Sequence, residues 1–204
     1  MLHIIEAAGW PIWPLIIASV IALGIIVERA WSLQRGKIVP RDLLPDVAQE
    51  VKQKGVTQDL LNRLSQGTLL GRIFAVGLKN VRSSRDVMKE SLEEAGRVAV
   101  HELERFLTTL GTIASLAPIM GLFGTVVGMI EIFGSQGGTG MNSNPQQLAH
   151  GISVALYNTA FGLIVAIPSM IFYRHYRAKV DGLVVEMETQ AIKLVEIIHG
   201  ERQQ

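Results

Sequence analysis

Residues 106–173 form a continuous stretch that carries one charged side chain, Glu131, and in which Gly, Ala, Ser and Thr are scattered among Leu, Ile and Val. A helix rises about 1.5 Å per residue, so about 20 residues cross the roughly 30 Å hydrocarbon core of a bilayer. The stretch is long enough for two such helices. We predict them at 106–130 and 152–173, joined by a polar turn at 134–151.

An uncharged run at residues 7–27 predicts a third span. No Lys or Arg precedes it, whereas a cleavable signal peptide needs a basic start, so we interpret the run as a retained anchor. Trp10 and Trp13 are typical of a bilayer surface, and proline is tolerated in a first helical turn. The expected fold is all-α, with three transmembrane helices and long cytoplasmic helical extensions, divided into segments 1–27, 28–105, 106–133, 134–151, 152–173 and 174–204.

The basic residues outside the spans predict the orientation. Segment 28–105 holds 14 Lys and Arg and segment 174–204 holds 5, which together account for all 19. By the positive-inside rule these segments are cytoplasmic, and the N-terminus and the turn at 134–151 are periplasmic. The net charge of +1 gives no indication of a nucleic-acid partner, and a chain without cysteine has no disulfide framework.

Helices are expected throughout the cytoplasmic segments. The patterns at 46–54, 57–64 and 69–81 predict short helices, whereas 86–105 and 174–198 run into the adjoining spans without a breaker. The tail carries apolar residues at helical spacing, which predicts a stripe that needs a partner surface. That partner is either another helix of the same chain or a neighbouring copy. The stripe comprises Val180, Leu183, Val184, Met187, Ala191, Leu194, Val195 and Ile198.

Uncharged polar side chains are the chemistry that the two inner spans offer. Such side chains either bond to their own backbone and pack between helices, or line a wet path. Glu131 lies at the outer end of its span, where a structural role and an accessory role in ion handling are both open. The polar residues are Thr112, Ser115, Thr125, Ser153, Asn158, Thr159 and Ser169.

Small residues and prolines predict where the inner spans approach and bend. Gly124 and Gly128 have the GxxxG spacing that permits close backbone approach, and Gly121 lies one turn before them. Pro118 and Pro168 each remove a backbone donor, so we expect local kinks. No nucleophile and base pair, metal-ligand spacing or phosphate loop indicates an enzyme, and no cofactor is expected.

Two long motifs resemble those of the ExbB/TolQ/MotA proton-channel family. APIMGLFGTVVGM at 117–129 is similar to the family's second-span motif, and GISVALYNTAFGLIVAIP at 151–168 is similar to its third-span motif. They occur in the family's order, and the three-span layout is closer to ExbB or TolQ than to MotA. By position, Thr125 and Thr159 match the family's pore threonines, whereas Gly121, Gly124, Gly162 and Pro168 match its packing and kink positions.

The resemblance implies a mechanism. It implies a homo-pentamer in the bacterial inner membrane whose second and third spans surround a dimer of a single-span ExbD/TolR-like subunit. That subunit would bring a membrane aspartate, which exchanges H+, or alternatively Na+, opposite the threonines. Loss of the aspartate's charge on protonation would let the inner dimer move within the ring. A TonB-like protein would carry the resulting work to outer-membrane transport.

One position departs from the resemblance, and two other functions stay open. ExbB and TolQ commonly have a glutamate three residues after the glycine that opens the third-span motif, and Val154 occupies that place. The protein would then manage without that glutamate, or use Glu131 or water. The alternatives are a TolQ-like subunit for cell-envelope maintenance and a non-conducting membrane scaffold, in which the glycines and threonines serve helix packing only.

Overall fold

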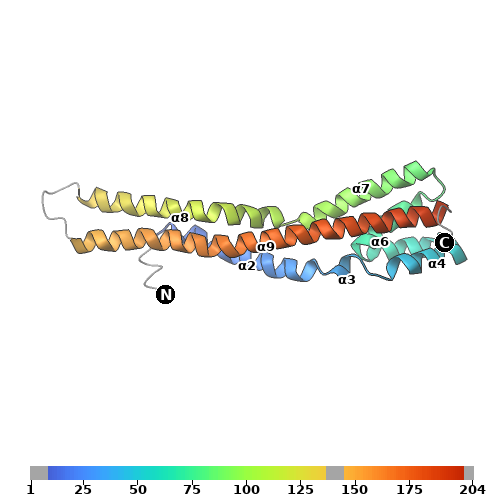
Figure 1. Ribbon diagram of the computed structural model, residues 1–204, viewed down its shortest axis with the longest axis horizontal. Coiled ribbons are helices and arrows are strands. Elements are labelled where there is room, and N and C mark those ends of the chain that lie inside the picture. The colour runs from blue at the N-terminus through green and yellow to red at the C-terminus, as the bar shows by residue number, and fades with distance from the viewer. Residues whose placement is uncertain (1–8, 137–144, 200–204) are drawn as a thin grey trace. The chain divides into compact units, whose positions relative to one another are not determined.

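The computed structural model describes residues 9–136 and 145–199, and within these ranges it contains helices and no strand (Figure 1). Three helices are long and apolar enough to cross a membrane. They are α2 (Ile12–Ser32), α8 (Leu107–Gln136) and α9 (Pro145–His199). The all-α prediction with three spans and a long helical extension is therefore confirmed.

The chain divides into two compact units. The membrane unit comprises residues 1–28 and 106–175, and the helical extension comprises residues 29–105 and 176–204. Helix α9 contributes its first part to the membrane unit and its second part to the extension. The two units are described separately below.

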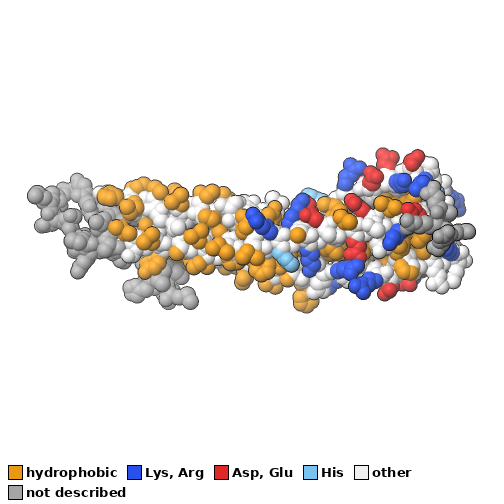
Figure 2. Space-filling model, in the orientation of Figure 1, with side chains coloured by type: hydrophobic (Ala, Val, Ile, Leu, Met, Phe, Trp, Pro, Cys, Tyr) orange, Lys and Arg blue, Asp and Glu red, His pale blue; other side chains and the backbone are white. Residues whose placement is uncertain are grey.

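In the membrane unit, α2, α8 and α9 share a small core. Leu15 of α2 packs with Ala117 of α8 and with Val165 and Ala166 of α9. Large apolar side chains point outward instead, and Figure 2 shows them covering this unit. Such outward apolar surface is expected where the surroundings are lipid, because lipid tails are as apolar as leucine.

Helix α2 presents one regular outward stripe. Trp13, Ile17, Val20, Val27 and Trp31 are each at least 58% exposed. They follow one another at intervals of three or four residues, with Gly24 filling the remaining place, so they lie on one face of the helix. Two indoles thus close the two ends of an otherwise aliphatic stripe.

The helical extension is built around α6. Its shorter helices are α3 (Arg35–Ile38), α4 (Leu43–Lys54), α5 (Gln58–Gln66) and α6 (Leu69–Lys79), followed by α7 (Arg85–Glu104). Most of α6 is buried, including Phe74, because α5 and α7 pack against it. A Cβ on Gly77 would lie 2.6 Å from Leu92 Cδ2, so glycine permits the close approach of α6 and α7.

Three helices of the extension begin at a Thr or Ser that caps the N-terminus of the helix. Side-chain oxygens of Thr57, Thr68 and Ser84 accept hydrogen bonds from the backbone N–H three residues later, at 3.3, 3.2 and 3.4 Å. Such bonds satisfy N–H groups that a helix cannot pair internally. The tail stripe packs within the chain, as one of the two expectations had it: Val180, Leu183, Met187, Ala191, Leu194 and Val195 are buried.

Two predicted boundaries are wrong. Helix α7 ends at Glu104 and does not run into α8, because Phe106 adopts a left-handed backbone with φ of 65°. The predicted turn at 134–151 is shorter, since α8 continues to Gln136 and α9 begins at Pro145, where proline suits a first turn. By contrast, α9 runs without a break from the third span into the tail, as predicted.

A buried arginine accompanies the end of α7. Arg29, 6% exposed, donates a hydrogen bond from Nη1 to the carbonyl of Leu103 at 3.2 Å. The last carbonyls of a helix have no partner within the helix, and a cation is favoured there. A left-handed backbone costs a residue with a side chain roughly 1–2 kcal/mol. The hydrogen bond from Arg29 to Leu103 thus adds stability next to Phe106, the residue with the unfavourable left-handed backbone.

Arg35 of α3 forms a two-pronged ion pair with Glu186 of α9. Arg35 Nε lies 2.9 Å from Glu186 Oε2, and Nη2 bonds the other carboxylate oxygen. The hydrogen bond from Arg35, together with the charges of Arg35 and Arg41, holds the pKa of Glu186 below its ordinary value, although desolvation opposes this. The pair connects α3 to α9 at the surface of the extension.

We expect acid to remove the contribution of this ion pair to stability. A carboxyl whose pKa is lowered by folding stabilises the folded state above its ordinary pKa, and this contribution is lost as the pH falls through the lowered value. Glu186→Gln should therefore slightly lower the unfolding temperature near pH 7, and the difference from the parent should shrink below about pH 4. Thermal unfolding of the purified protein across this range measures both effects. In an Arg35→Gln background the substitution should change nothing further, and an undiminished loss there would contradict the pairing.

Candidate ion pathway between the inner spans

Helices α8 and α9 approach each other through glycines. A Cβ on Gly162 would lie 2.6 Å from the carbonyl oxygen of Ala117 and 3.1 Å from Gly121 Cα. A Cβ on Gly121 would lie 2.8 Å from the Asn158 carbonyl oxygen, and one on Gly124 would lie 2.7 Å from Asn158 Cβ. Real side chains essentially never make contacts this short with backbone. The backbones of α8 and α9 therefore touch at Gly121 and Gly162, and Gly124 makes room for the side chain of Asn158; we call this region the α8–α9 contact.

The other residues predicted for packing and kinks have different surroundings. A Cβ on Gly128 would meet Ala155 Cβ at an ordinary 3.7 Å, so the GxxxG pair is tight at Gly124 and looser at Gly128. Pro118 and Pro168 lie inside α8 and α9, and both helices continue through them. The prolines thus remove single backbone donors without ending either helix.

Asn158 lies inside the α8–α9 contact and is 1% exposed. Its neighbour Thr159 is half-buried, and the Thr159 Cα would be 3.0 Å from a Cβ on Gly121. Thr125, one turn after Gly121, is also half-buried, and its Oγ1 donates to the Leu122 carbonyl at 2.6 Å. The side chains of both threonines are therefore partly exposed at the edge of the contact, although the backbone of Thr159 belongs to it. Their role in lining a pore stays a prediction, as does that of Asn158.

The remaining hydroxyls mostly bond to their own helix. Ser115 Oγ donates to the Gly111 carbonyl at 2.9 Å, Thr112 Oγ1 to Thr108 at 2.8 Å, and Ser169 Oγ to Val165 at 2.7 Å. Ser169 is buried, whereas Ser115 and Ser153 are exposed. Four hydroxyls thus bond back to their own helices, and a role in lining a wet path stays a prediction for each: Ser115, Thr112, Thr125 and Ser169. A hydroxyl that donates to a carbonyl still has lone pairs available as acceptors.

For three residues named in the predictions the structure describes the backbone but not the side chain. Glu131 lies in α8, and His150 and Val154 lie in α9. His150 was expected in the polar turn, and its helical backbone corrects that expectation. The accessory role of Glu131 stays a prediction.

Two contacts of the membrane unit were not predicted from the sequence. A Cβ on Gly111 would lie 3.0 Å from Tyr173 Cε2, so this glycine makes room for the ring of Tyr173. Trp10 and Phe123 form an edge-to-face pair with centroids 6.0 Å apart, which ties the start of α2 to α8. The spacing of Gly111 and Ser115, two small residues four apart, was the available signal for the first contact. Nothing in the sequence indicates the second.

The inner spans contain almost no charged side chains. Apart from Glu131, no Asp, Glu, Lys or Arg occurs in residues 106–173. Over the ranges 9–136 and 145–199, no group of His, Asp and Glu is placed to hold a metal ion. The inner spans thus offer hydroxyls, one buried amide and closely apposed backbones. These features define a polytopic helical membrane protein whose apolar inner spans carry uncharged polar side chains and, in their middle, no charge.

Comparison with known proteins assigns this class more closely. The model of the MotA/TolQ/ExbB proton channel family matches residues 65–189. The chain belongs to this family. The match includes α7, α8 and most of α9, and therefore the whole α8–α9 contact.

Individual relatives carry both ExbB and TolQ names. The biopolymer transport protein ExbB of Aquifex aeolicus is 35% identical over 147 residues, which are 71% of this chain and 93% of that protein. The Tol-Pal system protein TolQ of Pseudomonas aeruginosa is 32% identical over 165 residues, 76% of this chain and 68% of that protein. An ExbB-like biopolymer transport protein of Synechocystis sp. is 30% identical over 168 residues, 81% of this chain and 66% of that protein.

Proposed function

We propose that the protein is the ring subunit of an ion-driven motor in the bacterial inner membrane. In this proposal five copies surround a dimer of an ExbD-like single-span subunit, and H+ flow drives movement of that dimer. The work energises outer-membrane transport through a TonB-like protein. Membership in a proton channel family supports the conducting role, and the ExbB names of two of the relatives support the transport role.

The observation that carries the proposal is a pair of apolar spans that contain several hydroxyls but no carboxylate in their middle. An ion-conducting path through a membrane needs a group that binds and releases the ion, and ionisable groups at membrane depth mark such sites. Thr125 and Thr159 offer hydroxyls beside the α8–α9 contact, while the one acidic residue of the inner spans, Glu131, is near the end of α8. A partner's membrane aspartate would complete the path opposite the threonines.

The orientation in this proposal places the N-terminus in the periplasm and the C-terminus in the cytoplasm. It rests on the distribution of Lys and Arg, all 19 of which lie in segments 28–105 and 174–204. With this orientation the extension, including the Arg35–Glu186 pair, is cytoplasmic. H+ is the coupling ion that the family description supports, with Na+ as the alternative.

A TolQ-like role in cell-envelope maintenance is the second function that a specific observation favours. The TolQ of Pseudomonas aeruginosa is 32% identical, close to the 35% of the Aquifex aeolicus ExbB. Both roles use the same ring and the same type of partner, so they differ in the protein that receives the work. A deletion strain that loses outer-membrane transport would indicate the first role, and one that loses envelope integrity would indicate the second.

Native mass spectrometry of the protein, extracted gently from its own membranes, tests the proposal. We expect five copies together with two copies of a small single-span subunit whose span contains an aspartate. An assembly without such a subunit, under conditions that preserve other membrane complexes, would contradict the motor. That result would favour the non-conducting scaffold and leave Glu131 as the carboxylate available for ion handling.

A further inference from the structure

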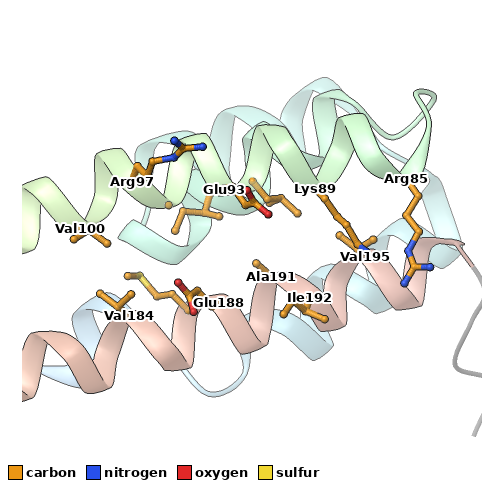
Figure 3. A pocket seen from close by; sticks show the side chains of 14 residues that line it. Arg85, Lys89, Glu93, Arg97, Val100, Val184, Glu188, Ala191, Ile192 and Val195 are labelled. Atoms are coloured by element: carbon orange, nitrogen blue, oxygen red, sulfur yellow. The ribbon is translucent and has the colours of Figure 1, made fainter.

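A groove runs between α7 and α9 in the helical extension (Figure 3). It has a volume of about 590 Å³. Its floor is apolar and includes Ile73 of α6, Leu92 of α7 and Met187 of α9. All of its lining residues belong to the extension, so the groove is a feature of that unit alone.

The shape of the groove fits a helix. Its lining runs from Arg85 to Val100 along α7 and from Val195 back to Val184 along α9, and Figure 3 shows Arg85 beside Val195 and Val100 near Val184. Fifteen residues of helix correspond to roughly 22 Å, or about four turns. A long apolar groove between two antiparallel helices is the form that receives one face of a third helix.

The charges along the groove indicate what that third helix carries. The α7 side presents Arg85, Lys89 and Arg97, with Glu93 between them, whereas the α9 side presents Glu188. Cations therefore predominate on the α7 side. An occupant that places aliphatic side chains on the floor and carboxylates against α7 would complement this surface.

The opposite face of α7 itself has this composition. Val98 is 66% exposed, and Glu90 and Glu94 are exposed on the same face. These three residues precede Leu92, Gly96 and Val100 of the groove by two positions each. An α-helix turns about 100° per residue, so Val98 faces away from the groove and Glu94 is turned well away from it, whereas Glu90 lies at the edge of the groove, about 20° from Arg97. We call Glu90, Glu94 and Val98 the outer face of α7.

We propose that the α7–α9 groove receives the outer face of α7 from a second copy of this chain. The inference deepens the proposed function, because it rests on the assembly of several copies in one ring. Since Glu94 and Val98 are turned away from the groove, each copy can offer its outer face to one neighbour and its groove to the other. Such head-to-tail contacts close into rings when the rotation permits.

Cysteine cross-linking tests the contact directly, because the natural chain contains no cysteine. Val98 of α7 points away from the groove that Val184 of α9 lines, so Val98→Cys and Val184→Cys cannot join within one copy. In the double variant, mild oxidation of native membranes should give a ladder of covalent oligomers on a non-reducing gel. Each single variant should give none, and neither should Val98→Cys paired with Gln53→Cys, which is exposed on α4.

Charge reversal provides a second readout in the same cysteine background. Glu94→Lys or Arg97→Glu alone should lower the cross-linked fraction roughly tenfold, because like charges then face each other. The double reversal should restore it. Because Glu94 and Arg97 are also i,i+3 neighbours on α7, recovery supports the contact only when Glu94→Lys with Val98→Cys and Arg97→Glu with Val184→Cys are carried by separate, co-expressed copies.

The outcomes separate this inference from the proposed function. A five-membered assembly that gives no ladder with Val98→Cys and Val184→Cys would overturn the inference and leave the motor intact. A cross-link from Val184→Cys to a different protein alone would also overturn it. The absence of any oligomer would instead contradict the ring on which both depend.

Discussion

Gly162→Ala is expected to disrupt the α8–α9 contact and to prevent assembly of a stable protein. The added methyl would lie 2.6 Å from the Ala117 carbonyl oxygen, a backbone atom that cannot rotate away. Overpacking of a tight contact costs about 1–3 kcal/mol or more, and here one helix must shift along its length. The yield of folded protein and its unfolding temperature in mild detergent measure the effect.

Gly128→Ala is the matched control, because it adds the same methyl to the same contact. Its Cβ would meet Ala155 Cβ at 3.7 Å, an ordinary distance, so the variant should assemble as the parent does. Equal behaviour of the two variants would contradict the described geometry. A larger loss with Gly128→Ala would indicate that the neighbouring helices approach most closely at the other end of the contact.

Thr159→Ala and Thr125→Val are expected to abolish ion-driven activity while assembly is retained. Both residues are half-buried beside the contact, and neither substitution adds volume. If their hydroxyls bind an ion or a partner carboxylate, each loss removes a hydrogen bond to a charged group. Such bonds contribute about 1.5–3 kcal/mol, which corresponds to roughly tenfold to hundredfold in rate. Proton uptake by vesicles that contain the purified complex measures this rate.

Thr112→Val is the control for the threonine variants. Thr112 lies in the same helix as Thr125, is exposed, and donates to the carbonyl of Thr108 in its own helix. Its loss should leave proton uptake unchanged. Full activity of both Thr159→Ala and Thr125→Val would exclude the polar pathway, and loss of assembly in either would favour the scaffold.

Much of the fold was predictable because it depends on patterns that span many residues. Composition over 106–173 indicated two spans, and the unbroken helical pattern of the tail predicted the continuous α9. The break at Phe106 was not predictable, since neither glycine nor proline marks it. It occurs where Arg29, distant in sequence, bonds the end of α7, and no local pattern reports such a contact.

Part of the candidate site was also predictable from the sequence, and part was not. The small residues at 121, 124 and 162 predicted close helix packing, and a Cβ at these positions would lie 2.8, 2.7 and 2.6 Å from the facing helix. The burial of Asn158 was not predictable, because an amide beside a threonine suits a wet path and a helix contact equally. Which side of a helix faces its neighbour depends on packing of the whole bundle.

The outward stripe of α2 has a consequence for the choice of membrane. Trp13 and Trp31 are eighteen residues apart, which corresponds to about 27 Å of helix, slightly less than a typical hydrocarbon core of about 30 Å. Indoles prefer the headgroup level, so both can reach it when the helix stands nearly upright. A thinner bilayer would be accommodated by tilting, whereas a thicker one would have to be compressed around the helix. The spacing of two tryptophans thus matches this protein to membranes of a particular hydrophobic thickness.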